Sequence, residues 1–170
     1  MIELGGIEVS ETLQASKFVE SELFARTFRE GMALVEETAN YLDGDGREAS
    51  KALDREAALT YASISMRLTT QLMQIASWLL VLRAVREDEM KLSEAADDKY
   101  RVKMNDEEPA SLLEYGLPDR LMQLIGDADQ LFARIARLDK DLFTVGTMAS
   151  EKASHDAASQ QRALLKAFGG

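Results

Sequence analysis

The stretch TYASISMRLTTQLMQIASWLL, residues Thr60 to Leu80, decides the fold. It contains no proline or glycine, and Arg67 is its single charged residue. Apolar side chains recur along it at alternating steps of three and four, which is the spacing of one helical face. The wider segment Leu53 to Arg86, as one continuous helix, would be about 50 Å long. We therefore predict a long central helix whose core face is formed by Tyr61, Ile64, Leu68, Leu72, Ile75, Leu79 and Leu82.

The opposite face of this helix is polar but nearly uncharged. One interpretation is a solvated or helix-facing stripe without a special role. The other is a partner surface, because an exposed face this long normally carries Glu and Lys, whereas small hydroxyl residues let another backbone approach closely. Arginine is also common at protein interfaces. The residues of this candidate partner surface are Ser63, Arg67, Thr70, Gln74 and Ser77.

Composition limits the class of protein. The 170 residues are 46% hydrophobic, which favours one globular domain with a real core. A net charge of −10 argues against a nucleic-acid partner, and the absence of cysteine fits a reducing cytoplasm. The start, MIELGGIEVSE, does not resemble a signal peptide, and the apolar run Ile75 to Val85 is interrupted by Arg83 and too short to cross a bilayer. We expect a cytoplasmic protein without membrane insertion.

Two further helices are marked by their ends. Ser21 is a good N-cap for the first, and Gly44 and Gly46 supply the turn that ends it. The third follows Pro118 and repeats apolar residues every three or four positions from Leu121 to Leu142. We predict an all-α fold, an antiparallel three-helix bundle over residues 18–143 with helices at about 21–43, 52–98 and 118–143. A loose N-terminal arm (1–17) and a flexible, mobile C-terminal tail (144–170) flank it.

On the first helix, the predicted core face is Phe24, Phe28, Met32 with Val35, Ala39 and Leu42. Three helices cannot cover all the apolar surface in the second half of the central helix. We therefore expect a homodimer in which a second chain packs on Trp78, Leu80 and Val81.

The residues needed for catalysis are missing. The sole histidine, His155, lies in the predicted tail, where it suits neither a phosphotransfer site nor a catalytic triad. The carboxylates Asp97, Asp98 and 106–108 could bind calcium weakly, but they lack the ordered spacing of an EF-hand loop. We predict no catalytic residue, no cofactor and no metal site.

Two segments resemble a known family: FREGMALVEETANYLDGDGR (Phe28 to Arg47) and LTYASISMRLTTQLMQIASWLL (Leu59 to Leu80). A looser match covers LPDRLMQLI (Leu117 to Ile125). They resemble the alphaproteobacterial family of the regulator of CtrA degradation, RcdA. The resemblance implies a dimeric three-helix bundle with a flexible tail.

The same resemblance implies a non-enzymatic proteolytic adaptor that helps deliver cell-cycle regulators of the CtrA type to the ClpXP protease. The implied partners are ClpX with its receiver-type primer, a cyclic-di-GMP-binding adaptor and response-regulator substrates. The implied location is the cytoplasm, with transient gathering at the cell pole. The alternative is a structural dimeric helical bundle, or a polar localisation factor, without adaptor activity.

Overall fold

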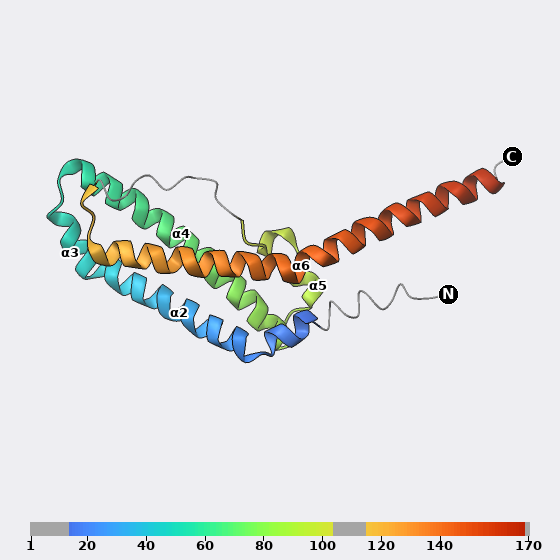
Figure 1. Ribbon diagram of the computed structural model, residues 1–170, viewed down its shortest axis with the longest axis horizontal. Coiled ribbons are helices and arrows are strands. Elements are labelled where there is room, and N and C mark those ends of the chain that lie inside the picture. Colours follow the sequence, from blue (N-terminus) through green and yellow to red (C-terminus); the bar gives the residue numbers. More distant parts are fainter. Residues whose placement is uncertain (1–13, 104–114, 169–170) are drawn as a thin grey trace.

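Three long helices, α2, α4 and α6, pack side by side in this computed structural model (Figure 1). The structure describes the backbone of residues 14–103 and 115–168, and the side chains of these residues up to Phe143. Every regular element within these ranges is helical, which confirms the all-α helical bundle. A short helical segment at residues 14–19 precedes the elements α2 (Glu22–Asp43), α3 (Asp45–Lys51), α4 (Arg55–Arg86), α5 (Leu92–Ala95), η1 (Asp98–Tyr100) and α6 (Asp119–Phe168).

The direction of the helices follows from their connections. α2 runs antiparallel to α4 and α6 (Figure 1). α4 and α6 run in the same direction, since Gln71 contacts Asp129 and Trp78 contacts Asp139 further along both helices. Parallel neighbours need a long connection, and 32 residues separate the end of α4 from the start of α6. The predicted antiparallel arrangement therefore holds for α2, whereas α4 and α6 are parallel.

The start of α2 has the predicted cap. Ser21 is extended, and its Oγ accepts a hydrogen bond from the Phe24 N–H at 3.2 Å. Glu22 lies in the first turn, where the helix dipole favours a negative charge. Residues before this cap are better held than predicted, because Ala15 and Val19 are buried. Most of the predicted arm, residues 1–13, lies outside the described residues.

α2 meets the core along a different line from the predicted one. A Cβ at Gly31 would collide with Leu79 Cδ1, so the two helices approach closely there. This contact rotates α2 so that Ala39 is exposed, while the predicted Phe28 is only partly buried. The buried line of α2 is Phe24, Thr27, Gly31, Leu34 and Thr38.

The link between α2 and α4 forms the short helix α3 rather than a simple turn. Gly46 is buried in it against two tyrosines. A Cβ at this position would lie 2.7 Å from the Tyr61 Oη and 2.8 Å from the backbone oxygen of Tyr41. Burial raises the pKa of both phenols, Tyr41 and Tyr61, above the usual value. The close approach therefore requires a residue without a side chain.

α4 ends earlier than predicted. Asp54 caps its start, accepting a hydrogen bond from the Ala57 N–H at 2.9 Å. Its end at Arg86 is set by Asp88, which has a φ of 58° and reverses the chain so that the Glu89 N–H donates to the Ala84 oxygen. The predicted helical extension to residue 98 is therefore wrong. The chain instead folds back through α5 and η1.

α6 begins as predicted and extends further. Its buried residues confirm the predicted repeat as far as Ile135: Leu121, Leu124, Ala128, Leu131 and Ile135 are all 0–1% exposed. The last two residues of that repeat, Leu138 and Leu142, are only partly buried. The helical backbone continues past Phe143 to Phe168 and runs beyond the end of the bundle (Figure 1). The predicted boundary at residue 144 is therefore no helix end, and the mobility of this segment stays a prediction.

Candidate functional site

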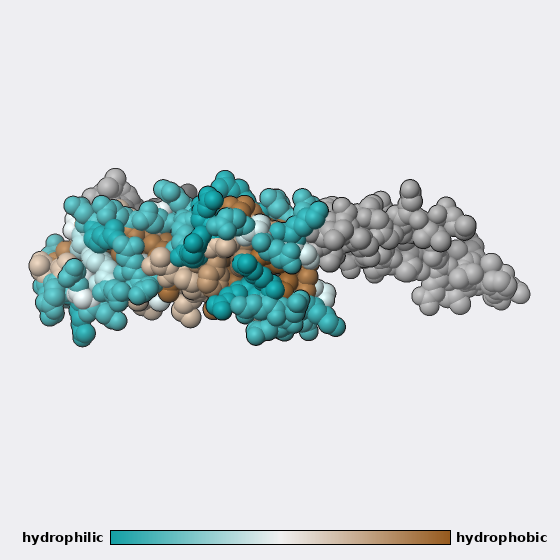
Figure 2. Space-filling view, turned by 90° about the horizontal axis from the view of Figure 1, so that it is seen from below, coloured by the Kyte–Doolittle hydropathy of each residue, from teal (hydrophilic) through white to brown (hydrophobic). Residues whose placement is uncertain are grey.

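The outer face of α4 differs from an ordinary protein surface. In the view of Figure 2, hydrophilic residues cover most of the surface of the bundle, and hydrophobic residues lie between them. On α4, by contrast, every exposed residue between Glu56 and Arg83 is uncharged. The chain as a whole is 29% charged, so this stretch is a clear departure. We call the exposed residues of this face the outer seam: Leu59, Ala62, Ser63, Met66, Thr69, Thr70, Met73, Ser77 and Leu80.

Four large apolar side chains repeat along the outer seam at intervals of seven residues. Leu59, Met66, Met73 and Leu80 are 65%, 72%, 67% and 50% exposed. Alanine, serine and threonine occupy the exposed positions between them. A seven-residue repeat keeps one line of side chains facing a partner helix, and small neighbours allow that helix to come close. The outer seam thus has the form of an unpaired helix-packing surface.

The threonines of the outer seam are less polar than their type suggests. The Thr69 hydroxyl donates to the Ser65 carbonyl at 2.8 Å, and the Thr70 hydroxyl donates to the Met66 carbonyl at 3.0 Å. Their hydrogen bonds are therefore made within α4. Because a satisfied hydroxyl costs less to bury than an unsatisfied one, covering these residues with a partner would cost little.

The predicted partner residues occupy two positions relative to the outer seam. Ser63, Thr70 and Ser77 belong to it, whereas Arg67 and Gln74 are half-buried along its edge. The prediction missed the three large residues Leu59, Met66 and Met73. Their signal was in the sequence, since they share a seven-residue spacing with Leu80.

Trp78 does not belong to the predicted dimer surface. It is 2% exposed, and its Nε1–H donates to Asp139 Oδ1 at 2.9 Å. The Arg101 Nε–H donates to the same carboxylate at 2.9 and 3.0 Å, and the Arg101 guanidinium lies 4.9 Å from the Phe143 ring centre. Trp78 is therefore a core residue, and the Asp139 carboxylate on α6 is shared between Trp78 and Arg101, which follows η1.

The other two predicted dimer residues differ in exposure. Leu80 is half-exposed and belongs to the outer seam, while Val81 is partly buried against the core. Leu80 is thus available to a second chain, and dimerisation itself stays a prediction.

The predicted acidic cluster has ordinary structural contacts where it is described. Asp97 accepts a hydrogen bond from the Lys99 N–H at 3.0 Å, and Asp98 lies 3.7 Å from Lys103. Residues 106–108 lie outside the described ranges. Within those ranges, no group of three or more His, Cys, Asp or Glu residues is placed to hold a metal ion. His155 falls in the part of α6 beyond the described side chains.

Comparison with known proteins agrees with this architecture. The family described as "Protein of unknown function (DUF1465)" matches residues 15–168. The chain is similar to RcdA from Caulobacter crescentus, known from a crystal structure, with 52% sequence identity and a TM-score of 0.62. The match covers 73% of this chain and 93% of that one. No curated protein sequence matches the chain.

The segments that resembled a family in the sequence are the ones that build this bundle. Phe28 to Arg47 forms most of α2 and the start of α3, and Leu59 to Leu80 forms the centre of α4, including the outer seam. With the family match over most of the chain and 52% identity to a solved member, the protein belongs to the RcdA family.

Proposed function

We propose that the protein is a non-enzymatic adaptor that helps deliver cell-cycle regulators of the CtrA type to the ClpXP protease. The observation that carries the proposal is membership of the RcdA family, at 52% identity over 93% of the Caulobacter crescentus protein. The outer seam supports it, because an exposed, uncharged helix face is suited to binding another protein. The proposed partners are ClpX with its receiver-type primer, a cyclic-di-GMP-binding adaptor and response-regulator substrates.

An adaptor raises the rate of proteolysis by raising effective concentration. When cargo and protease are bound together, their encounter becomes nearly intramolecular, which strengthens binding by about 10²–10⁴ without a new contact. This mechanism requires separate docking surfaces rather than a catalytic group. The proposal therefore assigns binding roles to Ser63, Thr70 and Ser77 in the outer seam and to Arg67 and Gln74 along its edge.

Self-association is the first role that we assign to the outer seam. Leu59 to Leu80 spans about 30 Å along α4, enough for several contacts in register with a second copy. The large residues at intervals of seven provide side chains for packing, and the small ones between them allow close approach. We accordingly move the proposed dimer surface from Trp78 to Leu59, Met66, Met73 and Leu80.

A membrane is the other environment that could accept an apolar helix. By length and composition alone α4 could span a bilayer. Its inner face, however, is packed against α2 and α6, and Trp78 is bonded to the charged pair of Asp139 and Arg101. We therefore propose a cytoplasmic protein without membrane insertion. Its transient gathering at the cell pole is proposed from the resemblance to the RcdA family alone.

A reconstituted degradation assay tests the adaptor role. Purified ClpXP, the primer, the cyclic-di-GMP-binding adaptor and a CtrA-type substrate are mixed with and without this protein. We expect faster substrate loss when it is present. No change in rate, with all other components active, would refute the proposal.

Arg67→Glu tests the partner role of the α4 face. Reversing the sole charge of this stretch should weaken either self-association or cargo delivery. Arg47→Glu is the matched control, because Arg47 is exposed on α3 and lies outside the outer seam. Unchanged mass and unchanged delivery in Arg67→Glu would remove this residue from the partner surface.

The second candidate is a structural dimeric bundle, or a polar localisation factor, without adaptor activity. The outer seam supports it equally, since a dimer surface alone would explain an uncharged face. A protein that dimerises and reaches the pole as a fluorescent fusion, but leaves degradation unchanged, would fit this candidate.

A further inference from the structure

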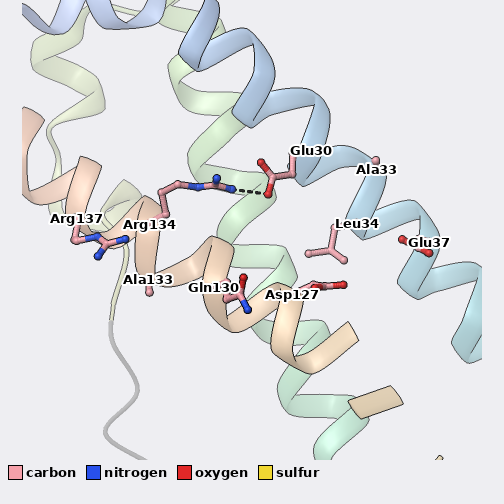
Figure 3. A pocket seen from close by; sticks show the side chains of 9 residues that line it. All are labelled: Glu30, Ala33, Leu34, Glu37, Asp127, Gln130, Ala133, Arg134 and Arg137. Carbon is pink, nitrogen blue, oxygen red and sulfur yellow. Dashed lines mark hydrogen bonds and ion pairs between the residues drawn. The ribbon is translucent and has the colours of Figure 1, made fainter. Parts of the chain in front are cut away.

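A groove runs between α2 and α6, separate from the outer seam. All nine lining residues belong to these two helices (Figure 3). Its volume is about 670 Å³, within the range of about 300–1,000 Å³ that is common for ligand sites. The lining residues are Glu30, Ala33, Leu34, Glu37, Asp127, Gln130, Ala133, Arg134 and Arg137.

Small side chains open the groove, and charged ones border it. Ala33 and Ala133 leave room between the helices, and Leu34 is buried against the core. The α2 wall is acidic, whereas one end of the α6 wall carries Arg134, which reaches across to Glu30, and Arg137, which lies further along α6 (Figure 3). The groove therefore has charge separated along it rather than one uniform sign.

The two arginines have unused hydrogen-bonding capacity. Arg134 donates through one terminal nitrogen to Glu30, but its Nε–H is buried and has no partner. Arg137 makes no ion pair or hydrogen bond within the described part of the chain. The buried Nε–H is out of a ligand's reach, but the Arg134 side chain as a whole is 41% exposed. Charge-assisted hydrogen bonds from the terminal nitrogens of Arg134 and Arg137 to a carboxylate are stronger than neutral ones.

We propose that the α2–α6 groove binds a peptide segment of a partner protein through an acidic side chain placed against Arg134 and Arg137. The neighbouring Glu30, Glu37 and Asp127 would repel a continuous polyanion such as a nucleic acid. They would accept a segment with one acidic residue and a basic residue near it. This binding surface is separate from the α4 face that the adaptor proposal uses. Binding to it can be measured with the purified chain alone, without the protease.

The spacing of charges defines the segment further. Asp127 and Arg134 are seven residues apart on α6, which is about 10 Å along the axis. An extended peptide covers that distance in about three residues. The preferred ligand is therefore an extended segment in which an acidic and a basic residue are three positions apart.

Fluorescence anisotropy with labelled peptides tests the proposal. The probe is a serine-rich, capped 12-residue peptide with Glu and Lys three positions apart, and its matched form has Gln in place of Glu. We expect saturable binding of the Glu probe and binding about tenfold weaker for the Gln probe. Arg137→Gln should weaken binding of the Glu probe to a similar degree.

Glu30→Gln provides a test in the opposite direction. Glu30 competes with the ligand for Arg134, so its removal should tighten binding of the Glu probe. Arg47→Gln on α3 should leave binding unchanged, and circular dichroism confirms that each variant is folded.

The proposal is overturned by absence of saturable binding, by equal binding to Arg137→Gln, by weaker binding to Glu30→Gln, or by an RNA 12-mer that binds more tightly through the same arginines. A degradation assay that fails while the probe still binds would refute the adaptor role alone.

Discussion

On the inner face of α4, Trp78, Leu79 and Leu82 are 2%, 0% and 1% exposed, whereas Leu59 and Met66 on its outer face are 65% and 72% exposed. Neither face carries a charged residue in its central part apart from Arg67, which lies at the edge. A surface helix of a monomer normally has an apolar stripe toward the core and charged residues toward water. Folding of one chain explains the inner face of α4 but not the composition of the outer face.

The first prediction concerns the contacts of the inner face of α4 and their contribution to the free energy of unfolding. Arg101→Ala removes the cation beside Asp139, whose side chain is 6% exposed, and leaves a buried carboxylate held by the Trp78 indole alone. Breaking such a pair should lower the free energy of unfolding by about 3 kcal/mol. Urea denaturation measures this loss, and the emission of the sole tryptophan reports the change around Trp78.

Lys103→Ala is the matched control for this prediction. Lys103 lies two residues further on and pairs with Asp98 at the surface, at 3.7 Å. Exposed pairs contribute little, so stability should stay close to that of the unchanged protein. Equal unfolding midpoints for the two variants would show that Asp139 does not depend on Arg101.

Ile75→Ala and Met73→Ala compare the two faces directly. Ile75 is 0% exposed and Met73 is 67% exposed, only two residues apart on the same helix. Truncating the buried residue should cost about 2–5 kcal/mol by loss of burial and formation of a cavity. Met73→Ala should leave the unfolding midpoint at low protein concentration nearly unchanged. Similar losses in both variants would contradict the assignment of faces.

Gly46→Ala tests the close packing at the N-terminal end of the inner face of α4, where Tyr61 contacts α3. The new methyl group would lie within 2.8 Å of the Tyr61 Oη and the Tyr41 backbone oxygen. Because a backbone atom cannot move away cheaply, the clash should cost about 1–3 kcal/mol despite the better helix propensity of alanine.

Gly126→Ala should change the free energy of unfolding in the opposite direction from Gly46→Ala. Gly126 lies inside α6, and a Cβ there would meet nothing within 4 Å. Only the helix propensity changes, so this variant should be more stable by about 0.5–1 kcal/mol. Thermal unfolding of the two variants measures both effects, and destabilisation by Gly126→Ala would show that the propensity argument fails at this site.

Local signals in the sequence predicted much of the bundle, and long-range contacts account for most of what they missed. The Ser21 cap and the repeat from Leu121 to Ile135 depend on neighbouring residues, so both could be read directly. The burial of Trp78 depends on Asp139, 61 positions away in the chain. The end of α4 depends on a positive φ at Asp88, for which aspartate is a weak marker.

The prediction of the partner surface failed for a different reason, because the pattern of the outer seam was visible in the sequence. Its residues at intervals of seven were readable, but an apolar residue on a long helix is normally assigned to the core of its own chain. Sequence periodicity alone cannot tell an apolar line that is buried in its own chain from one that stays exposed. The exposure of Leu59, Met66 and Met73 in the folded chain makes that distinction.

The smallest effect on folding, and the most direct test of the outer face, is expected from the double variant Met66→Glu, Met73→Glu. Both side chains are already exposed, so the free energy of unfolding of the single chain should hardly change. Two carboxylates would place like charges and a large desolvation cost in a seam covered by a second copy. Light scattering at micromolar concentration should therefore give a dimer for the unchanged protein and a mass near 18.9 kDa for the variant.

Leu23→Glu is the control, since Leu23 is 50% exposed on α2 and lies outside the seam. A dimer that survives in the double variant, or an unchanged protein that is already monomeric, would remove self-association from the outer face of α4.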